Sequence, residues 1–347
     1  MRKGCTDRVR RGRLSRRELL MDMGWIVKVR GMNSTSVAST ASAQPQPSER
    51  SNLSLWEYVS FTVVHAMAAL LLTCLSLQGL YQFGRAFGTL EWLINFKRRR
   101  RFAASLERVL ERRFTPQERR QAGREFFTRG RCDKLFYLVF DRIPRDKASA
   151  LLTIGNQQLL DEAVGRGRGV YVALSHHGAH HVIAMLLALR GFRTAGVRDR
   201  HEGAMRRYVQ GRFDRRYPEF QRMRVIYADS FPRDIYRCFE DGYLLGSAMD
   251  VDRVRNSNQK AEEVTIFSER RLFLSGPLRV AIRCQAPVLQ AFIISEHGFR
   301  YRLEIAAMLV DPVKVVDEDA AVAQAMRTYA ANVESHLRKT PSLLTRV

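Results

Sequence analysis

The pattern of apolar and polar positions divides the chain into three parts. Residues 1–31 are basic and include a weakly apolar stretch interrupted by Asp22, and residues 33–52 are mainly Ser, Thr, Ala, Gln and Pro without apolar periodicity, which is typical of a flexible tail. Residues 53–95 begin with a long apolar run, and residues 96–347 hold shorter apolar runs separated by helical periodicity. We therefore predict a disordered basic and polar tail, a membrane anchor helix region and one globular domain.

The apolar run is long enough to cross a bilayer. Between residues 59 and 80 the only side chain that could carry a charge is His65, and about 20 apolar residues span the hydrocarbon core. Trp56 and Tyr81 stand near the two ends, where interfacial aromatic side chains belong. The basic residues at 97–101 predict, by the positive-inside rule, a cytoplasmic domain after the helix. Ser, Thr, His and Gln dilute the run, so a core helix or a helix lying on the membrane surface stays an alternative.

Strands alternate with helices in the rest of the chain. Residues 102–165 have a helical pattern, and the segment 115–118, Thr-Pro-Gln-Glu, is a capping box with Pro at the first helical position. Beyond it, this alternation predicts an α/β fold in which helices cover a mixed sheet. The strands are expected at 169–175, 193–198, 223–228, 243–249, 287–294 and 299–307, and the helices at 182–190, 202–216, 231–240, 276–284 and 317–339.

Composition narrows the class of protein. Hydrophobic residues make up 46% of the 347 residues, which is too many for a disordered chain. The formal net charge of +23 indicates acidic partners: nucleic acid, an anionic membrane or acidic carriers and substrates. The 5 cysteines are scattered without a CxxC pair, which argues against disulfides and cysteine-bound zinc. The basic head lacks the cleavage pattern of a secretory signal.

The sharpest chemical feature is the segment 175–181, Ser-His-His-Gly-Ala-His-His, directly after a buried strand. A strand-to-helix turn places side chains at the carboxyl edge of a sheet, where α/β ligand sites form. One interpretation is general-base catalysis, because histidine accepts protons near neutral pH. A second is metal binding by His176/His180 or His177/His181, although no HExxH glutamate accompanies them. The third is that these histidines only cap and solvate the turn.

Several motifs, taken in order, resemble those of the lipid A late acyltransferases, the lauroyl/myristoyl transferases of the lysophospholipid acyltransferase superfamily. In that family a histidine follows a strand and a Gly-rich turn and stands five residues before an acidic residue, and His176 matches this histidine. The resemblance covers residues 55–340. Further matching segments are Val197-Arg198, an Arg-rich helix with Arg212, Gly242 to Asp252, Val264–Phe267, Ser275-Gly276-Pro277 and Gln285 to Val288.

The resemblance implies the fold, activity and partners. The fold would be glycerolphosphate-acyltransferase-like, after an N-terminal membrane helix. The enzyme would move a fatty acyl group from acyl carrier protein, or acyl-CoA, to a hydroxyl of a lipid or glycolipid such as lipid A. The protein would lie at the cell inner membrane as a single-pass or embedded protein, with its catalytic domain on the cytoplasmic side. His176 would be the general base, and no cofactor or metal is expected. The basic surface would then attract the acidic carrier protein and anionic lipid.

One position departs from the family pattern. His181 stands where the family has the acidic partner of the catalytic histidine, and a histidine supplies no negative charge. Three outcomes are open: Asp250 or Asp252 orients His176 instead, His181 holds the ring through a neutral hydrogen bond, or the protein has lost activity and only binds lipid. We predict His176, His181 and Asp250 as the catalytic residues.

Substrate binding is expected at Arg198, Arg212, Asp252 and Gly276. The two arginines would stabilise an oxyanion or hold phosphates. Gly276 would open a helix whose N-terminus faces a phosphate, although each feature is equally compatible with a solvated basic face or an ordinary helix start. A metal-dependent hydrolase using the histidines is the rival enzyme. Nucleic-acid binding is rejected, because the arginines are dispersed and no zinc-finger or RNA-binding signature accompanies them.

Overall fold

The computed structural model describes residues 54–111, 113–198, 204–227, 233–250 and 260–344. These residues belong to one unit of the chain, residues 48–347. The predicted tail, residues 1–52, lies outside the described residues. The boundaries that the sequence predicts between tail, anchor region and globular domain stay predictions.

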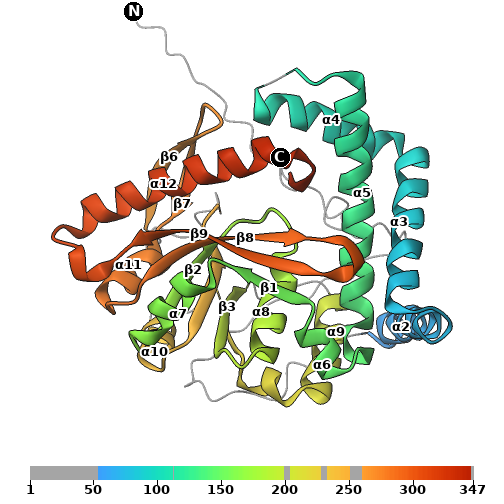
Figure 1. Ribbon diagram of the computed structural model, residues 1–347, viewed down its shortest axis with the longest axis horizontal. Helices are drawn as coiled ribbons and strands as arrows, with labels where there is room; N and C mark the ends of the chain where they lie inside the picture. The colour runs from blue at the N-terminus through green and yellow to red at the C-terminus, as the bar shows by residue number, and fades with distance from the viewer. Residues whose placement is uncertain (1–53, 112, 199–203, 228–232, 251–259, 345–347) are drawn as a thin grey trace, which may run out of the picture. The chain divides into compact units, whose positions relative to one another are not determined.

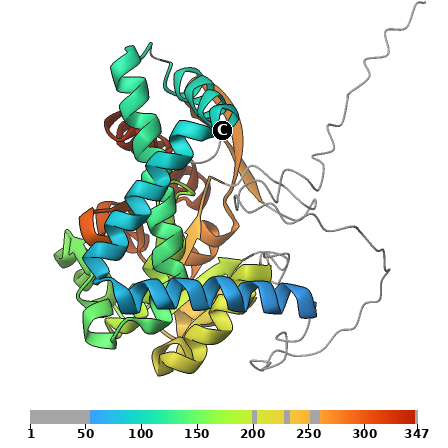
Figure 2. The same ribbon diagram turned by 90° about the vertical axis from the view of Figure 1, so that its right-hand side faces the viewer.

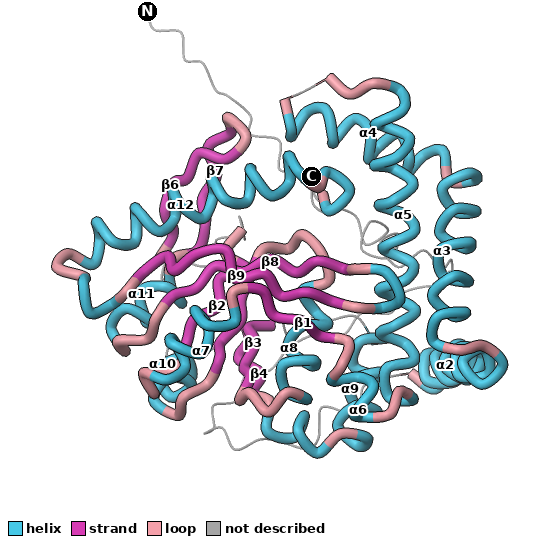
Figure 3. The backbone as a smooth tube through the Cα atoms, viewed as in Figure 1, coloured by secondary structure: helices cyan, strands magenta, loops and turns pink. Residues whose placement is uncertain are grey.

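A mixed sheet of seven strands runs through the centre of the described residues (Figure 3). The strands are β1 (Leu152–Gly155), β2 (Val170–Leu174), β3 (Thr194–Arg198), β4 (Arg224–Tyr227), β5 (Leu244–Ala248), β8 (Val288–Ser295) and β9 (Tyr301–Val310). Their order is β1-β9-β8-β2-β5-β3-β4. Neighbours from β8 to β4 are parallel, whereas β9 is antiparallel to β8. The carboxyl ends of β8, β2, β5 and β3 therefore meet at one edge, where α/β ligand sites form.

Helices cover both faces of this sheet, as the sequence predicts (Figure 1). Every side chain of β2 is buried, which a parallel strand achieves only with apolar helices on both sides. On one face pack α10 (Arg233–Glu240), α11 (Gly276–Arg283) and α12 (Glu318–Lys339). On the other pack α5 (Pro116–Val139), α6 (Arg145–Ser149), α7 (Gln157–Gly165), α8 (His180–Leu189) and α9 (Ala204–Arg216).

The first part of the described chain forms three helices that lead into α5. They are α2 (Leu55–Cys74), α3 (Leu77–Ile94) and α4 (Phe96–Leu110). Capping boxes start α2 at Ser54 and α5 at Thr115, the second of which the sequence predicts. At Gly88 an added Cβ atom would lie 2.5 Å from the Cα atom of Thr128, so α3 and α5 approach to backbone contact. Glu91 of α3 pairs with Arg131 of α5 across this contact.

The side of helix α2 that faces the protein makes polar contacts among apolar ones, and its other side is apolar and exposed. The buried His65 lies 2.9 Å from the carboxylate of Asp141, and the hydroxyl of Tyr208 donates to Thr62 over 3.2 Å. The exposed side carries large apolar residues: Leu55, Trp56, Val59, Val63, Met67 and Leu70. Among the described residues, α2 alone is long and apolar enough to cross a membrane. In Figure 2 it is the blue helix that runs across the lower half of the view.

Two segments differ from the sequence-based predictions. Residues 152–155 lie within the stretch expected to be helical, but they form β1 on the edge of the sheet, paired with β9. The β-branched Thr153 and Ile154 favour a strand once a partner strand is present, which local periodicity does not reveal. A separate hairpin, β6 (Ala261–Ile266) and β7 (Glu269–Leu274), is not among the strands expected from the apolar pattern, although β6 includes most of the family-like segment Val264–Phe267.

Candidate active site

A glycine fixes the turn that carries the histidine-rich segment. β2 ends at Leu174 and α8 begins at His180. Between them Gly178 has a φ of 84°, in the left-handed region, and an added Cβ atom there would lie 2.5 Å from the carbonyl oxygen of Ile293 in β8. Because only glycine fits this conformation and this space, the turn packs directly on the neighbouring strand.

His176 is joined to Asp250 across the ends of two parallel strands. Leu174 of β2 pairs with Ala248 of β5, so the residues two positions later come to lie side by side. The Nδ1 atom of His176 lies 2.7 Å from Oδ1 of Asp250. The backbone N–H of His176 also donates to both oxygens of this carboxylate, over 3.1 and 2.9 Å. Asp250 therefore holds the backbone and the ring of His176 together.

The Asp250 carboxylate is charged in this setting. Burial alone would raise its pKa, but the hydrogen bond from the His176 ring, the charges of His176 and His177 and the His176 backbone N–H hold the pKa below its usual value. An ionised carboxylate accepts hydrogen bonds only, so the proton on His176 belongs on Nδ1. The Nε2 atom then has the lone pair that a general base needs.

His181 has a different environment from His176. Its ring meets Tyr137 of α5 edge to face, with 5.3 Å between the centroids. Burial, helped by the positive charges of Arg206 and Lys134, lowers the pKa of His181 to about 4. His181 is therefore neutral at neutral pH, and its ring cannot supply the negative charge that stabilises a cation at His176.

The remaining histidines of the segment are not part of a candidate metal site. In the part of the chain that the structure describes, no group of three or more His, Cys, Asp or Glu side chains is arranged to hold a metal. His180 lies between His176 and His181, with 5.5 and 5.6 Å between the ring centroids. Burial, with positive charge nearby, holds the pKa of His180 well below its usual value. His177 Nε2 lies 3.9 Å from the other oxygen of Asp250.

Several residues around the segment come from distant helices and were not predicted from the sequence. His336 of α12 stacks on Phe292 of β8, with 4.1 Å between the ring centroids. Burial and the charges of His177, Arg129 and others lower its pKa to about 4. No sequence motif marks His336, Arg129 or Tyr137, because their helices lie more than 30 residues from the segment along the chain.

The predicted substrate-binding residues are spread over the same edge and beyond. Arg198 ends β3, two strands away from β2, and hydrogen-bonds the side chain of Gln210 over 3.3 Å. Two strand spacings correspond to about 10 Å. Gly276 opens α11, and no atom lies within 4 Å of the Cβ position there. Arg198 and Gly276 thus stand at element ends, as expected from the sequence.

Arg212 and Asp252 are placed differently. The Nε–H of Arg212 donates to Asp141 over 2.9 Å, which ties α9 to the segment after α5 and places Arg212 beside α2 rather than beside His176. Asp252 lies outside the described residues. Of the residues predicted from the sequence, the structure therefore brings His176 and Asp250 together, whereas His181 contacts Tyr137 and Arg212 contacts Asp141.

Comparison with protein families identifies a match over most of the chain. The family model described as bacterial lipid A biosynthesis acyltransferase matches residues 47–343, which is most of the chain and includes every described helix and strand. A comparison with curated proteins finds no match.

Proposed function

Since the chain belongs to the bacterial lipid A biosynthesis acyltransferase family, we propose that it moves a fatty acyl group from an acyl carrier protein thioester, or from acyl-CoA, to a hydroxyl of a lipid or glycolipid such as a lipid A precursor. The observation that carries this proposal is the hydrogen bond of 2.7 Å between His176 and Asp250 at the carboxyl edge of the sheet. We also propose that the fold is that of the glycerolphosphate acyltransferases.

In the proposed reaction, Nε2 of His176 removes the proton of the acceptor hydroxyl as its oxygen attacks the thioester carbonyl carbon. The tetrahedral intermediate then collapses, the carbon–sulfur bond breaks, and the sulfur leaves with the proton that the imidazolium returns. No acyl-enzyme forms, so the buried Ser175 has a structural role. Asp250 fixes the tautomer of His176 and stabilises its cation while the proton is held there.

This assignment gives Asp250 the role of the acidic residue that the family has five positions after the histidine. The carboxylate comes from the end of β5 instead of from α8, yet it reaches the same ring atom that needs orientation. His181 is not the orienting group in this proposal, because a ring with a pKa of about 4 is neutral and packs on Tyr137. His181 instead fills the space beside α5.

Substrate-binding roles follow from position. Arg198 would stabilise the oxyanion of the tetrahedral intermediate or hold a phosphate, since its guanidinium is always charged and it stands at the edge where His176 lies. The open start of α11 at Gly276 would receive an anionic group of a substrate. Asp252 is proposed, as the second carboxylate after β5, to contact the acceptor.

Membrane association fits the acyl acceptor. If α2 crossed the bilayer, its residues Thr62 and His65 would lie near mid-bilayer depth. Their partners Tyr208 and Asp141 would have to lie there too, and an ionised group at that depth is costly. We propose instead that α2 lies in the interface of the cell inner membrane with its exposed apolar side in the lipid. The catalytic domain would then face the cytoplasm, where the acidic carrier protein is found.

Mass spectrometry of lipids tests this function. Lipids are compared from cells that lack the gene and carry wild type, His176→Gln or the control His297→Gln, which changes an exposed histidine in the turn between β8 and β9. The proposal predicts that one lipid gains an acyl chain with wild type and with the control. It predicts no such gain with H176Q at equal protein level. A full gain with H176Q would refute the catalytic role of His176.

A further inference from the structure

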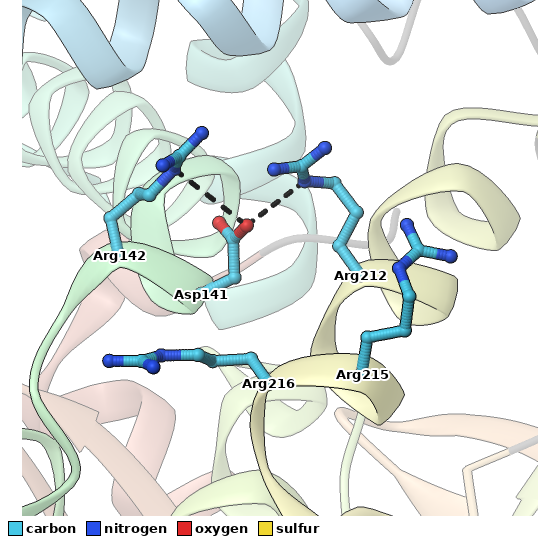
Figure 4. Close-up of a pocket in the computed structure, with 5 residues that line it drawn as sticks. All are labelled: Asp141, Arg142, Arg212, Arg215 and Arg216. Carbon is cyan, nitrogen blue, oxygen red and sulfur yellow. Dashed lines mark hydrogen bonds and ion pairs between the residues drawn. The ribbon is translucent and has the colours of Figure 1, made fainter.

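Arginines line a pocket beside α2 that the proposed acyl transfer does not use. Its volume is about 460 Å³. Figure 4 shows the side chains of Arg142 and Arg212 on either side of the Asp141 carboxylate, with Arg215 rising beside Arg212. The lining residues are Asp141, Arg142, Arg212, Arg215 and Arg216.

The single carboxylate of this pocket is already neutralised. Asp141 receives hydrogen bonds from His65 and Arg212, each over 2.9 Å. Burial opposes ionisation of Asp141, but these two hydrogen bonds and the charges of their donors hold its pKa below the usual value. The Nε atom of Arg142 lies 4.0 Å from Oδ2 of Asp141. Arg215 and Arg216 form no ion pair with any other residue that the structure describes, so the pocket keeps an excess of positive charge.

The pocket borders α2 on the side of the helix that packs on the protein, and the exposed apolar residues of α2 lie on its other side. His65 of α2 binds Asp141 at the pocket wall, and a ribbon in the colour of α2 passes above Arg142 and Arg212 in Figure 4. An anionic lipid held there would have its charged group among the arginines, next to the helix whose outer side is apolar. Four guanidinium groups so close together repel one another, and an anion relieves that repulsion.

Helices α5 and α9 connect the pocket to the histidine segment. Tyr137 of α5 contacts both His181 and Phe213, with ring centroids 5.3 and 5.2 Å apart. Asp141 follows Tyr137 by four residues and Arg212 precedes Phe213, so the pocket lies about one helical turn, roughly 6 Å, from this contact. A ligand in the pocket is thus close to the candidate active site without touching His176 or Asp250.

We propose that this arginine pocket binds the phosphate group of an anionic lipid at the membrane surface. The planar guanidinium forms paired hydrogen bonds with phosphate oxygens, which a neutral or zwitterionic headgroup satisfies poorly. The open volume leaves room for the glycerol or sugar that carries the phosphate. The proposal does not depend on acyl transfer, because it concerns binding at residues other than the catalytic pair.

Calorimetric titration of the full-length protein in a neutral detergent tests this site. The probes are dihexanoyl phosphatidic acid, dihexanoyl phosphatidylcholine and inorganic phosphate. The pocket variant is Arg142→Gln/Arg215→Gln/Arg216→Gln, which retains the Asp141–Arg212 pair. The matched control is Arg237→Gln/Arg270→Gln/Arg327→Gln, which removes the same charge from exposed arginines on α10, β7 and α12.

The expected result is that phosphatidic acid binds at least tenfold tighter than phosphatidylcholine or inorganic phosphate. The pocket variant should lose at least tenfold of this affinity, and the control less than twofold. An equal loss in both variants would overturn the proposal, since it would show a diffuse charge effect. Inorganic phosphate binding as tightly as phosphatidic acid would overturn the lipid assignment. If the triple variant unfolds, Arg215→Gln alone replaces it, and an unchanged affinity there would also overturn the proposal.

Discussion

The imidazole Nδ1 of His176 lies 2.7 Å from a carboxylate oxygen of Asp250, 74 residues away along the chain. The same carboxylate accepts the backbone N–H of His176. One side chain thus sets the position of the turn and the tautomer of its histidine. Because β5 is the direct neighbour of β2, this relationship depends on the order of strands in the sheet rather than on spacing along one helix.

Replacement of Gly178 should disturb this arrangement. In Gly178→Ala the new methyl group meets the carbonyl oxygen of Ile293 and the residue is held at a positive φ. We expect the free energy of unfolding to fall by about 2 kcal/mol and acyl transfer to fall with it, since the turn carries His176. Denaturant unfolding in detergent measures the first effect. Gly191→Ala is the control: it also has a positive φ but meets no atom within 4 Å, so it should leave transfer intact.

The stability of the protein should depend on His181 below neutral pH. Its pKa is about 4 in the folded protein and 6.5 in a model peptide, so the unfolded chain binds the proton first as the pH falls. The contribution of His181 is therefore complete above pH 6.5 and is lost between pH 6.5 and 4. Because the ring is partly exposed, we expect the free energy of unfolding to fall by about 2 kcal/mol over this pH range.

Unfolding measured at pH 7 and pH 5 tests this dependence. His181→Asn should reduce the difference between the two pH values, whereas His297→Asn at the exposed turn should leave it unchanged. The same dependence of stability on pH in wild type and H181N would contradict the neutral state of His181.

The hydrogen bond between His65 of α2 and Asp141 should contribute to the local stability of α2. Asp141→Asn removes the charge that neutralises Arg212 and weakens the hydrogen bond with His65. We expect a loss of about 2 kcal/mol of unfolding free energy, less than for a fully buried pair because Arg212 is 25% exposed. Hydrogen exchange in α2 should increase.

The matched control for this prediction is Asp311→Asn, which breaks the pair with Arg166 on the surface. It should cost less than about 1 kcal/mol and leave exchange in α2 as in wild type. Slow exchange in α2 of D141N would show that apolar contacts alone hold this helix.

Much of the fold is readable from the sequence. The strand β2 is a continuous apolar run and β5 and β8 are mainly apolar, and the helix starts at Thr115 and Gly276 carry capping or Gly-Pro signals. β1 is not readable, because residues 152–155 become a strand only by pairing with β9 at the far end of the chain. Such pairing depends on tertiary contacts that local propensity does not contain.

The candidate site can be predicted in part from the sequence. His176 and Asp250 each follow a buried strand, so the sequence places both at the carboxyl edge of the sheet. It leaves Asp250, Asp252 and His181 as alternatives, since strand order decides which of them reaches His176. No local sequence pattern predicts the contact of His181 with Tyr137 or the stacking of His336 on Phe292, because each joins segments far apart in the chain.

The central claim is that Asp250, and not the residue at position 181, orients the base His176. The most direct measurement is the rate of transfer from an acyl carrier protein thioester to lipids extracted from cells that lack the gene, compared between Asp250→Asn and His181→Asn. We predict that D250N lowers the rate at least about 100-fold, because the ring loses its tautomer and its counter-charge, while H181N lowers it less than about tenfold. Equal losses in the two variants, or a near-normal rate in D250N, would contradict the account.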